Sequence, residues 1–395
     1  MKIVFSVPSG YHLRELLLPL KALLERDTEI EKGICITPGA PWRSEIFSDY
    51  SEKFDFIANP KTPKEHVKLF ASIRPNIVVT NTSGLDLNDV PILQAAKAVG
   101  ISALTFVASW DNVWKMERLH RQRKPQVLAD NLIVWNQMMA DHIRRIFPDY
   151  PKEQIHIIGA PRLDFFFHQN KIPSRRELLS YLGFPDDGSK IIHFATTELY
   201  PMDYIVKAVY EAARAGAIKH KLHLYASVHP GGNMETHKQY AEKHGVIVRY
   251  SFGRRERAPH PDFLYNPTVE EIYLLVALFK YTDVLINHSS TVAIESLLAD
   301  KPVINIKYGS PFDWWRWYRS MVYRDFQQHY QDLVAEGATC TVVNKQQLTA
   351  AVSHYLDHPE HDHAARQATL KKMITTIDGT ASEKVLALFK QVAQT

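Results

Sequence analysis

Short apolar runs alternate with stretches of helical spacing along most of the chain. After the first run, Leu13, Leu16, Leu17, Leu20 and Leu24 recur with the period of an α-helix. This alternation predicts βαβ units, and therefore a mostly parallel sheet with helices on both faces. The runs that we expect to be strands are 2–7, 33–37, 76–80, 102–107, 131–135, 156–158, 190–195, 221–228, 246–250, 283–287, 302–306 and 339–343.

The alternation pauses in a polar stretch between 168 and 190, which contains Pro173, Pro185 and the turn sequence Asp186-Asp187-Gly188. A chain of 395 residues is also long for a single core. We therefore predict an α/β protein of two consecutive domains, at 1–168 and 169–380, whose sheets face each other across a cleft. A last helix at 381–395 could pack back on the first domain.

Composition narrows the class of protein. The 45% of hydrophobic and 23% of charged residues are ordinary for a globular protein, and no apolar run is long enough for a transmembrane helix. Two distant cysteines, Cys35 and Cys340, suit a reducing cytoplasm, and a net charge of +4 does not call for nucleic acid. The tryptophan-rich stretch at 312–319 suits a buried cluster or a contact with the inner face of the membrane. The basic run at 254–257 is interpreted as a solvated loop.

The segment 283–295 carries the strongest chemical signal. An apolar strand ends at Asn287, and His288, Ser289, Ser290 and Thr291 follow at the expected start of a helix. Hydroxyls and unpaired N–H groups at a helix start favour phosphate, although the same residues also serve as ordinary N-caps. Glu295 lies one turn further on the same face, where a carboxylate can accept both hydroxyls of a ribose.

Two other strand ends in the second half carry polar groups. Thr196 and Thr197 follow 190–195, and their hydroxyls could contact a donor phosphate or simply cap a loop. His229 follows 221–228 and precedes Pro230-Gly231-Gly232, where glycine lets the backbone approach a ligand closely. His229 is a candidate catalytic donor to a leaving-group oxygen, and a structural histidine in a turn is the alternative.

The first half offers two candidate general bases. His12 lies between the first strand and the first helix, and imidazole suits proton transfer at neutral pH. Asp111 follows the strand at 102–107, beside Trp110. A solvated histidine at a helix start and an aspartate that caps a loop are the structural alternatives. The sequence does not rank the two bases.

These segments resemble GT-B glycosyltransferases, and most closely the bacterial surface-polysaccharide transferases and the CDP-glycerol glycerophosphotransferases. Besides 287–304, the order of short motifs along roughly 80–390 carries the resemblance. The resemblance implies the GT-B fold, with two Rossmann-like domains that face each other across a cleft. It implies that residues 1–168 form an N-terminal acceptor domain and residues 169–380 a C-terminal nucleotide-donor domain, which holds the donor nucleotide. The further motifs are Ser109-Trp110-Asp111-Asn112, Leu132-Ile133-Val134-Trp135-Asn136, Gly159-Ala160-Pro161-Arg162-Leu163-Asp164, His229-Pro230 and Asp378-Gly379-Thr380-Ala381-Ser382.

The expected function is therefore transfer of a sugar from a nucleotide-activated donor to a hydroxyl of a glycan or lipid-linked glycan acceptor. We expect no cofactor and no metal, because the chain has no Asp-x-Asp motif after an apolar strand and no Walker or Gly-x-Gly-x-x-Gly loop. A CDP-polyol phosphotransferase and a UDP-sugar 2-epimerase share the architecture and remain alternatives. A scaffold without activity is the non-catalytic alternative, and binding of a nucleotide would argue against it.

Overall fold

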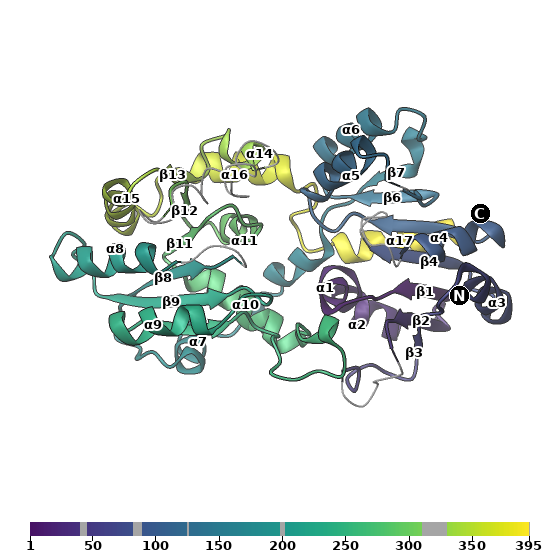
Figure 1. Ribbon diagram of the computed structural model, residues 1–395, viewed down its shortest axis with the longest axis horizontal. Helices are drawn as coiled ribbons and strands as arrows, with labels where there is room; N and C mark the ends of the chain where they lie inside the picture. The colour runs from purple at the N-terminus through teal and green to yellow at the C-terminus, as the bar shows by residue number, and fades with distance from the viewer. Residues whose placement is uncertain (40–45, 82–88, 125, 198–201, 310–329, 395) are drawn as a thin grey trace. The chain divides into compact units, whose positions relative to one another are not determined.

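The structure is a computed structural model that describes residues 1–39, 46–81, 89–124, 126–197, 202–309 and 330–394. Its contacts divide the chain into two compact units (Figure 1). The first unit consists of Met1–Phe167, Arg255–Pro267 and Lys372–Thr395, and the second of His168–Arg254 and Thr268–Lys371. Each unit is built on one parallel sheet, so the predicted α/β class with two Rossmann-like domains is confirmed.

The first unit contains a seven-stranded sheet in the order β3-β2-β1-β4-β5-β6-β7, in which every pairing is parallel. Its strands are β1 (Lys2–Ser6), β2 (Lys32–Thr37), β3 (Phe54–Ala58), β4 (Ile77–Asn81), β5 (Ser102–Phe106), β6 (Asn131–Val134) and β7 (Ile155–Ile157). Its main helices are α1 (Gly10–His12), the π-helix η1 (Leu13–Leu17), α2 (Leu18–Arg26), α3 (Pro63–Ile73), α4 (Asp89–Ala98), α5 (Asn112–Arg121), α6 (Gln137–Ile146) and α17 (Ala381–Val392).

The second unit contains a six-stranded parallel sheet in the order β10-β9-β8-β11-β12-β13. Its strands are β8 (Lys190–Ala195), β9 (Leu222–Val228), β10 (Ile247–Tyr250), β11 (Val284–Asn287), β12 (Val303–Ile306) and β13 (Cys340–Val342). Its helices include α7 (Arg175–Leu182), α8 (Asp203–Arg214), α9 (Glu235–His244), α10 (Val269–Tyr281), α11 (Val292–Leu298), α14 (Gln331–Val334) and α15 (Lys345–Asp357), and α16 (His363–Met373) leads back to the first unit.

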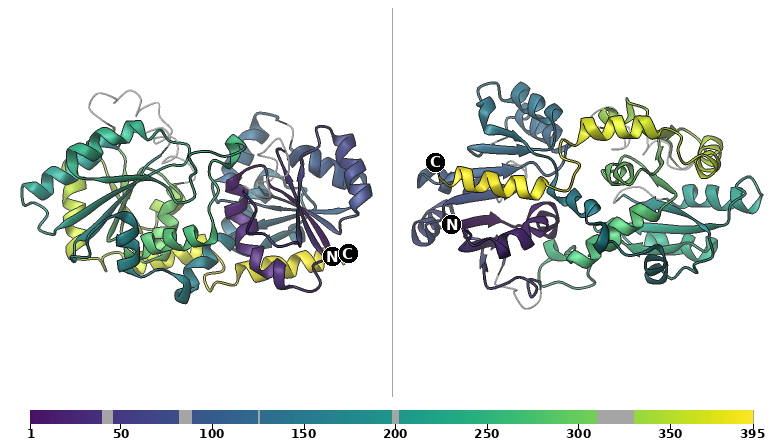
Figure 2. Two further views of the ribbon diagram at one scale, coloured as in Figure 1. Left: turned by 90° about the horizontal axis from the view of Figure 1, so that it is seen from below. Right: turned by 180° about the vertical axis from the view of Figure 1, so that it is seen from behind.

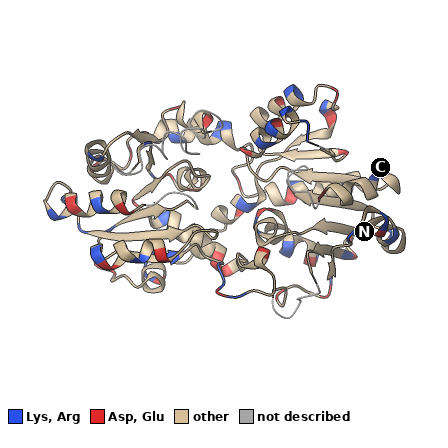
Figure 3. Cartoon of the chain, in the orientation of Figure 1, with Lys and Arg blue, Asp and Glu red and all other residues tan. Residues whose placement is uncertain are grey.

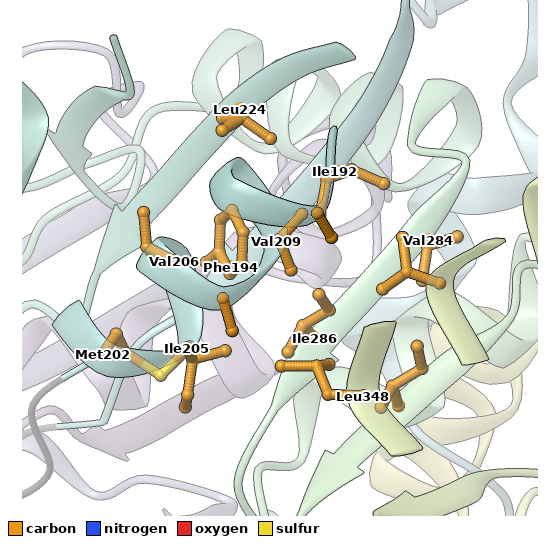
Figure 4. Packing of buried hydrophobic residues seen from close by; sticks show 14 of the residues in the cluster. Ile192, Phe194, Met202, Ile205, Val206, Val209, Leu224, Val284, Ile286 and Leu348 are labelled. Carbon is orange, nitrogen blue, oxygen red and sulfur yellow. The ribbon is translucent and has the colours of Figure 1, made fainter. Parts of the chain in front are cut away.

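The central strands of both sheets are buried on both faces, as βαβ crossovers require, whereas edge strands such as β3 and β10 are partly exposed. In Figure 3 the strands carry almost no charged residues, whereas the helices and loops carry many. Figure 4 shows the core of the second unit, where Ile205, Val206 and Val209 of α8 pack onto side chains of the central strands such as Phe194 and Ile286. The two rigid sheets thus fix where their loops begin. No described helix is long and apolar enough to cross a membrane.

The end of the chain returns to the first unit (yellow in Figure 2). The Asn136 side-chain amide donates to the carbonyl oxygen of Met373 at 2.6 Å, and the Thr376 hydroxyl donates to the carbonyl oxygen of Ile158. Gly159 has a φ of +116°, and a Cβ atom there would lie 3.0 Å from the Cβ atom of Thr376. The close approach of the two chain segments therefore requires glycine.

Asp164 caps the last helix. Its buried carboxylate accepts the N–H groups of Ala381 at 3.2 Å and of Ser382 at 2.7 Å, at the positive end of α17. The short motifs at 132–136, 159–164 and 378–382 therefore act together, because they hold the chain end on the first sheet. The observed units differ from the expected boundaries in two places, since 255–267 and 372–380 also belong to the first unit.

Candidate functional site

Each sheet has a point where the strand order reverses, and ligands of open α/β sheets bind outside the carboxyl ends of the strands at such a point. In the second sheet, β8 leads to β9 and β10 on one side, whereas β11 leads to β12 and β13 on the other. The loops after β8 and β11 therefore border the crevice. They carry Thr196-Thr197 and His288–Thr291, which the sequence singled out.

The loops after β8 and β9 are joined by a hydrogen bond. The buried Thr196 accepts the backbone N–H of His229 on its hydroxyl oxygen at 3.0 Å. The Gly231 N–H in turn donates to Nδ1 of His229 at 3.1 Å. In the neutral imidazole this bond leaves the proton on Nε2, so the ring presents an N–H donor at that atom. Thr197 follows as a half-buried residue.

A buried polar network lies at the end of β11. The Asn287 side-chain oxygen accepts the N–H of Ser290 at 2.9 Å, and its amide nitrogen donates to the side-chain oxygen of Asn305 at 3.2 Å. The Tyr330 hydroxyl donates to the same Asn305 oxygen at 2.9 Å, and Asn305 donates to the hydroxyl of Thr339, also at 2.9 Å. Buried polar groups of this kind hold a loop in one conformation, because breaking any bond leaves a desolvated partner.

The loop that follows is not a simple N-cap. Helix α11 begins at Val292, and the side chain of its N-cap residue, Thr291, makes no capping hydrogen bond. Ser289, Ser290 and Thr291 are half-buried, and Asn287 rather than a hydroxyl receives the N–H of Ser290. Glu295 lies in the first turn of α11 and is only 2% exposed.

His288 differs from its neighbours because its ring is buried, with 1% of the residue exposed. Its Nε2 atom lies 3.4 Å from the hydroxyl of Tyr204, which itself donates to the carbonyl oxygen of Tyr308 at 2.7 Å. Desolvation lowers the pKa of His288 to about 3. The ring is therefore neutral at pH 7 and brings no positive charge to an anionic ligand.

His193 was not singled out from the sequence, although it lies in β8 close to these loops. Its Nε2 atom forms a 2.7 Å hydrogen bond with the Ser227 hydroxyl, and burial lowers its pKa to about 3. Asn287 and Asn305, which form the network, were missed as well. The sequence does contain a signal for them, because each is a polar residue within or at the end of an apolar strand. That signal indicates a network only once β11 and β12 are known to be neighbours.

In the first sheet the strand order reverses between β1 and β4, and His12 lies in the short helix that follows β1. Its Nδ1 atom forms a 2.8 Å hydrogen bond with the Ser9 hydroxyl, and its carbonyl oxygen accepts the side-chain amide of Asn81, the last residue of β4, at 3.5 Å. His12 is therefore placed beside this second crevice. A π-helix begins at the next residue, and such segments are frequent at functional sites.

Asp111 lies further from that point, because it follows β5 and β4 lies between β1 and β5. Its carboxylate forms an ion pair with Lys115 at 2.7 Å, one turn along α5. Each of the two candidate bases thus has a local partner, and the sheet separates them by one strand. Among the residues that the structure describes, no group of three His, Cys, Asp or Glu side chains could hold a metal ion. The tryptophan-rich stretch 312–319 and Glu198 lie outside them.

Solved structures with the same fold include enzymes of several activities. A putative UDP-N-acetylglucosamine 2-epimerase from Listeria monocytogenes is 14% identical, with a TM-score of 0.66 over 98% of this chain and 95% of the other. The wall teichoic acid polymerase TagF, in a structure with CDPG, is 12% identical, with a TM-score of 0.62 over 100% and 88%. A glycosyltransferase from Rickettsia africae is 13% identical, with a TM-score of 0.56 over 99% and 98%. At such identities the likeness shows the fold alone.

A comparison with curated proteins finds no match. The sequence pattern of one family, described as CDP-Glycerol:Poly(glycerophosphate) glycerophosphotransferase, matches residues 92–390. The match begins within α4. It covers β5, β6 and β7 of the first sheet, all strands of the second sheet and nearly all of the returning chain end. The chain therefore belongs to the CDP-glycerol:poly(glycerophosphate) glycerophosphotransferase family and is a nucleotide-dependent transferase.

Proposed function

We propose that the protein transfers a sugar from a nucleotide-activated donor to a hydroxyl of a surface glycan, and that the second unit binds the donor. One observation carries this proposal. Around the crevice of the second sheet lie hydroxyls on Thr196, Ser289 and Ser290, the His229 ring, and a buried carboxylate on Glu295. Hydroxyl and N–H donors suit a diphosphate, and a carboxylate suits the two hydroxyls of a ribose.

In the proposed reaction the acceptor hydroxyl attacks the anomeric carbon, the bond from that carbon to the diphosphate breaks, and a nucleoside diphosphate leaves. Thr197, His229 and the loop 289–291 stabilise the leaving oxygens with hydrogen bonds in place of a cation. His12 removes the acceptor proton. His12 is favoured over Asp111 because it follows β1, where the strand order of the first sheet reverses, whereas Asp111 follows β5, which is separated from β1 by β4.

Transfer of a polyol phosphate from a CDP-polyol is the second candidate, and membership of the family favours it. In that reaction the acceptor attacks phosphorus, and a phosphoryl group under attack by an anionic oxygen requires charge stabilisation. The residues that we place around the donor are neutral hydroxyls, a histidine and one carboxylate. Both reactions expel an anionic phosphate, whose developing charge such hydrogen-bond donors stabilise, so the products of the reaction are what distinguishes the two candidates.

The nucleotide that is released separates the candidates. Sugar transfer releases a nucleoside diphosphate, polyol-phosphate transfer releases CMP, and epimerisation releases neither and needs no acceptor. We therefore propose to incubate the protein with a glycan acceptor and UDP-, GDP-, TDP- and CDP-linked donors, and to identify the nucleotides by chromatography. A Ser290→Ala and Thr291→Ala double variant controls for contaminating hydrolases. Release of CMP from CDP-glycerol alone would overturn sugar transfer and establish the second candidate.

A further inference from the structure

The segment 255–267 belongs to the first unit, although it lies in the sequence between β10 and α10 of the second sheet (green in Figure 2). Two hydrogen bonds of Arg255 close this segment on itself. The Arg255 N–H donates to the carbonyl oxygen of Leu264 at 2.7 Å, and the guanidinium donates to that of Asn266 at 2.8 Å. The basic run at 254–257 is therefore partly structural, in contrast to the solvated loop expected from the sequence.

An aromatic side chain anchors the closed segment on the first unit. Phe263 is completely buried, and its ring packs edge-on against Phe47 at 5.8 Å between centroids. Phe47 in turn stacks on Phe56 of β3 at 3.8 Å. Burial of a phenylalanine side chain is favourable, so packing of Phe263, and not only chain connectivity, holds the segment on this unit.

The anchored segment reaches the loop that carries His12. A Cβ atom on Gly10 would overlap the carbonyl oxygen of Tyr265, so the backbone of the segment crosses Gly10 directly. The Tyr265 ring is buried and packs against the ring of Tyr11 at 4.8 Å between centroids, with 33° between the ring planes. Gly10 and Tyr11, which make these two contacts with Tyr265, immediately precede His12.

We propose that Tyr265 is a positioning residue, which holds the turn at Gly10 and Tyr11 so that the His12 ring keeps one orientation toward the acceptor. This inference rests on the proposed role of His12 as the base. Two residues already contact His12: the Ser9 hydroxyl bonds to Nδ1 of the ring, and the Asn81 side chain bonds to the His12 carbonyl oxygen. The segment 255–267 adds the second support. A proton-transfer group gains from such restraint because the rate depends on geometry at the reacting atoms.

The test compares Tyr265→Ala with Tyr265→Phe, which keeps the ring. We expect Tyr265→Ala to lower kcat about tenfold, because the His12 ring loses one of its supports. The Kd of the donor should not change, because the proposed donor residues lie in the second unit. Tyr265→Phe should retain kcat. If Tyr265→Ala does not fold, Tyr11→Ala removes the other ring of the pair, which is 39% exposed and therefore tolerates truncation.

A measurement without turnover separates this inference from the proposed reaction. The His12 C2–H resonance, assigned by its loss in His12→Gln, reports the environment of the ring in the free protein. We expect it to shift or broaden in Tyr265→Ala and Tyr11→Ala and to be kept in Tyr265→Phe. An unchanged resonance and kcat in a folded Tyr265→Ala protein would overturn the inference. A changed resonance together with normal turnover of His12→Ala would instead overturn the role of His12 as base and leave the structural support in place.

Discussion

The carboxyl edges of the two sheets are built on one plan and carry different chemistry. In both sheets the strand beyond the reversal ends in a buried asparagine, Asn81 in β4 and Asn287 in β11. At the second edge Asn287 belongs to a network of neutral groups that fixes a loop of hydroxyls. At the first edge Asn81 contacts the backbone of His12, whose side chain belongs to the type that titrates near neutral pH. The comparison teaches that one topology supports a buried polar network under a loop of hydroxyls in one unit and, in the other, the histidine that we propose as the base.

The largest expected effect is at the first edge. His12→Ala should lower turnover by about 10²-fold or more, because general base catalysis typically contributes about 10²–10⁴-fold. Donor affinity, measured by calorimetry, should stay constant, since the proposed donor residues lie on the other sheet. A histidine base also predicts that activity declines on acidification, because protonation of the ring removes its capacity to accept a proton.

Asp111→Asn, measured in parallel, sharpens the assignment. Loss of turnover in Asp111→Asn with normal turnover in His12→Ala would transfer the role to Asp111. Normal turnover in both would remove the base from this edge, and Glu198 or a group of the substrate would be tested next.

The next effect is at the second edge. Ser290→Ala combined with Thr291→Ala should weaken nucleotide binding by about 10²-fold or more, because each of two hydrogen bonds to a charged group contributes about 1.5–3 kcal/mol. Calorimetry with UDP, CDP, GDP and TDP measures the change. Ser296→Ala, a buried hydroxyl on the same helix, is the matched control and should leave nucleotide affinity as it was. Unchanged affinity in a folded double variant would remove the loop from the donor site.

The two asparagines test the comparison directly. Asn287→Ala should destabilise the protein by about 1–3 kcal/mol, because it leaves polar groups of Ser290 and Asn305 buried without this partner. Asn81→Ala should cost less, since the bond from Asn81 to His12 is long, at 3.5 Å. Urea unfolding followed by circular dichroism measures both. Equal losses would show that the two edges are held with similar strength.

Acid should act on the second unit through two buried histidines. Burial lowers the pKa of His193 and of His288 to about 3, whereas an unfolded histidine has a pKa near 6.5. The unfolded chain therefore binds more protons between these values, and stability falls as the pH decreases below about 6.5. Each histidine contributes about 1.4 kcal/mol per pH unit in this window. The free energy of unfolding at pH 7 and pH 5.5 should differ less in His193→Gln than in the natural protein, and an unaltered difference would contradict the burial of a neutral ring.

The smallest expected effect is that of chelation. If hydroxyl and N–H donors stabilise the departing diphosphate, activity should persist in excess EDTA. The control is the same assay with Mg²⁺ restored. Complete loss in EDTA that Mg²⁺ or Mn²⁺ reverses would show that a cation, rather than the loop 289–291, supplies the charge at the second edge.

The strand pattern could be predicted from the sequence because buried parallel strands are continuous apolar runs. The expected runs overlap every observed strand except β3 (Phe54–Ala58). That strand lies at the edge of its sheet, and its residues alternate between buried and half-buried positions, with Asp55 at one of the latter, so it lacks the continuous apolar run. It could also be predicted that the polar residues after the strands lie at one edge of each sheet, because the carboxyl ends of parallel strands meet there.

Only the tertiary structure decided which of these residues share an environment. His288 follows a strand beside three hydroxyl residues, yet its ring is buried in contact with the Tyr204 hydroxyl, and desolvation keeps it neutral. The segments 255–267 and 372–395 continue the sequence of the second domain, yet they pack on the first. The sequence by itself determined the two sheets and the residues at their edges, because local periodicity and strand ends are properties of neighbouring positions. Burial, most hydrogen-bond partners and the contact of Tyr265 with the turn before His12 depend on residues tens to hundreds of positions apart, so only the folded chain determines them.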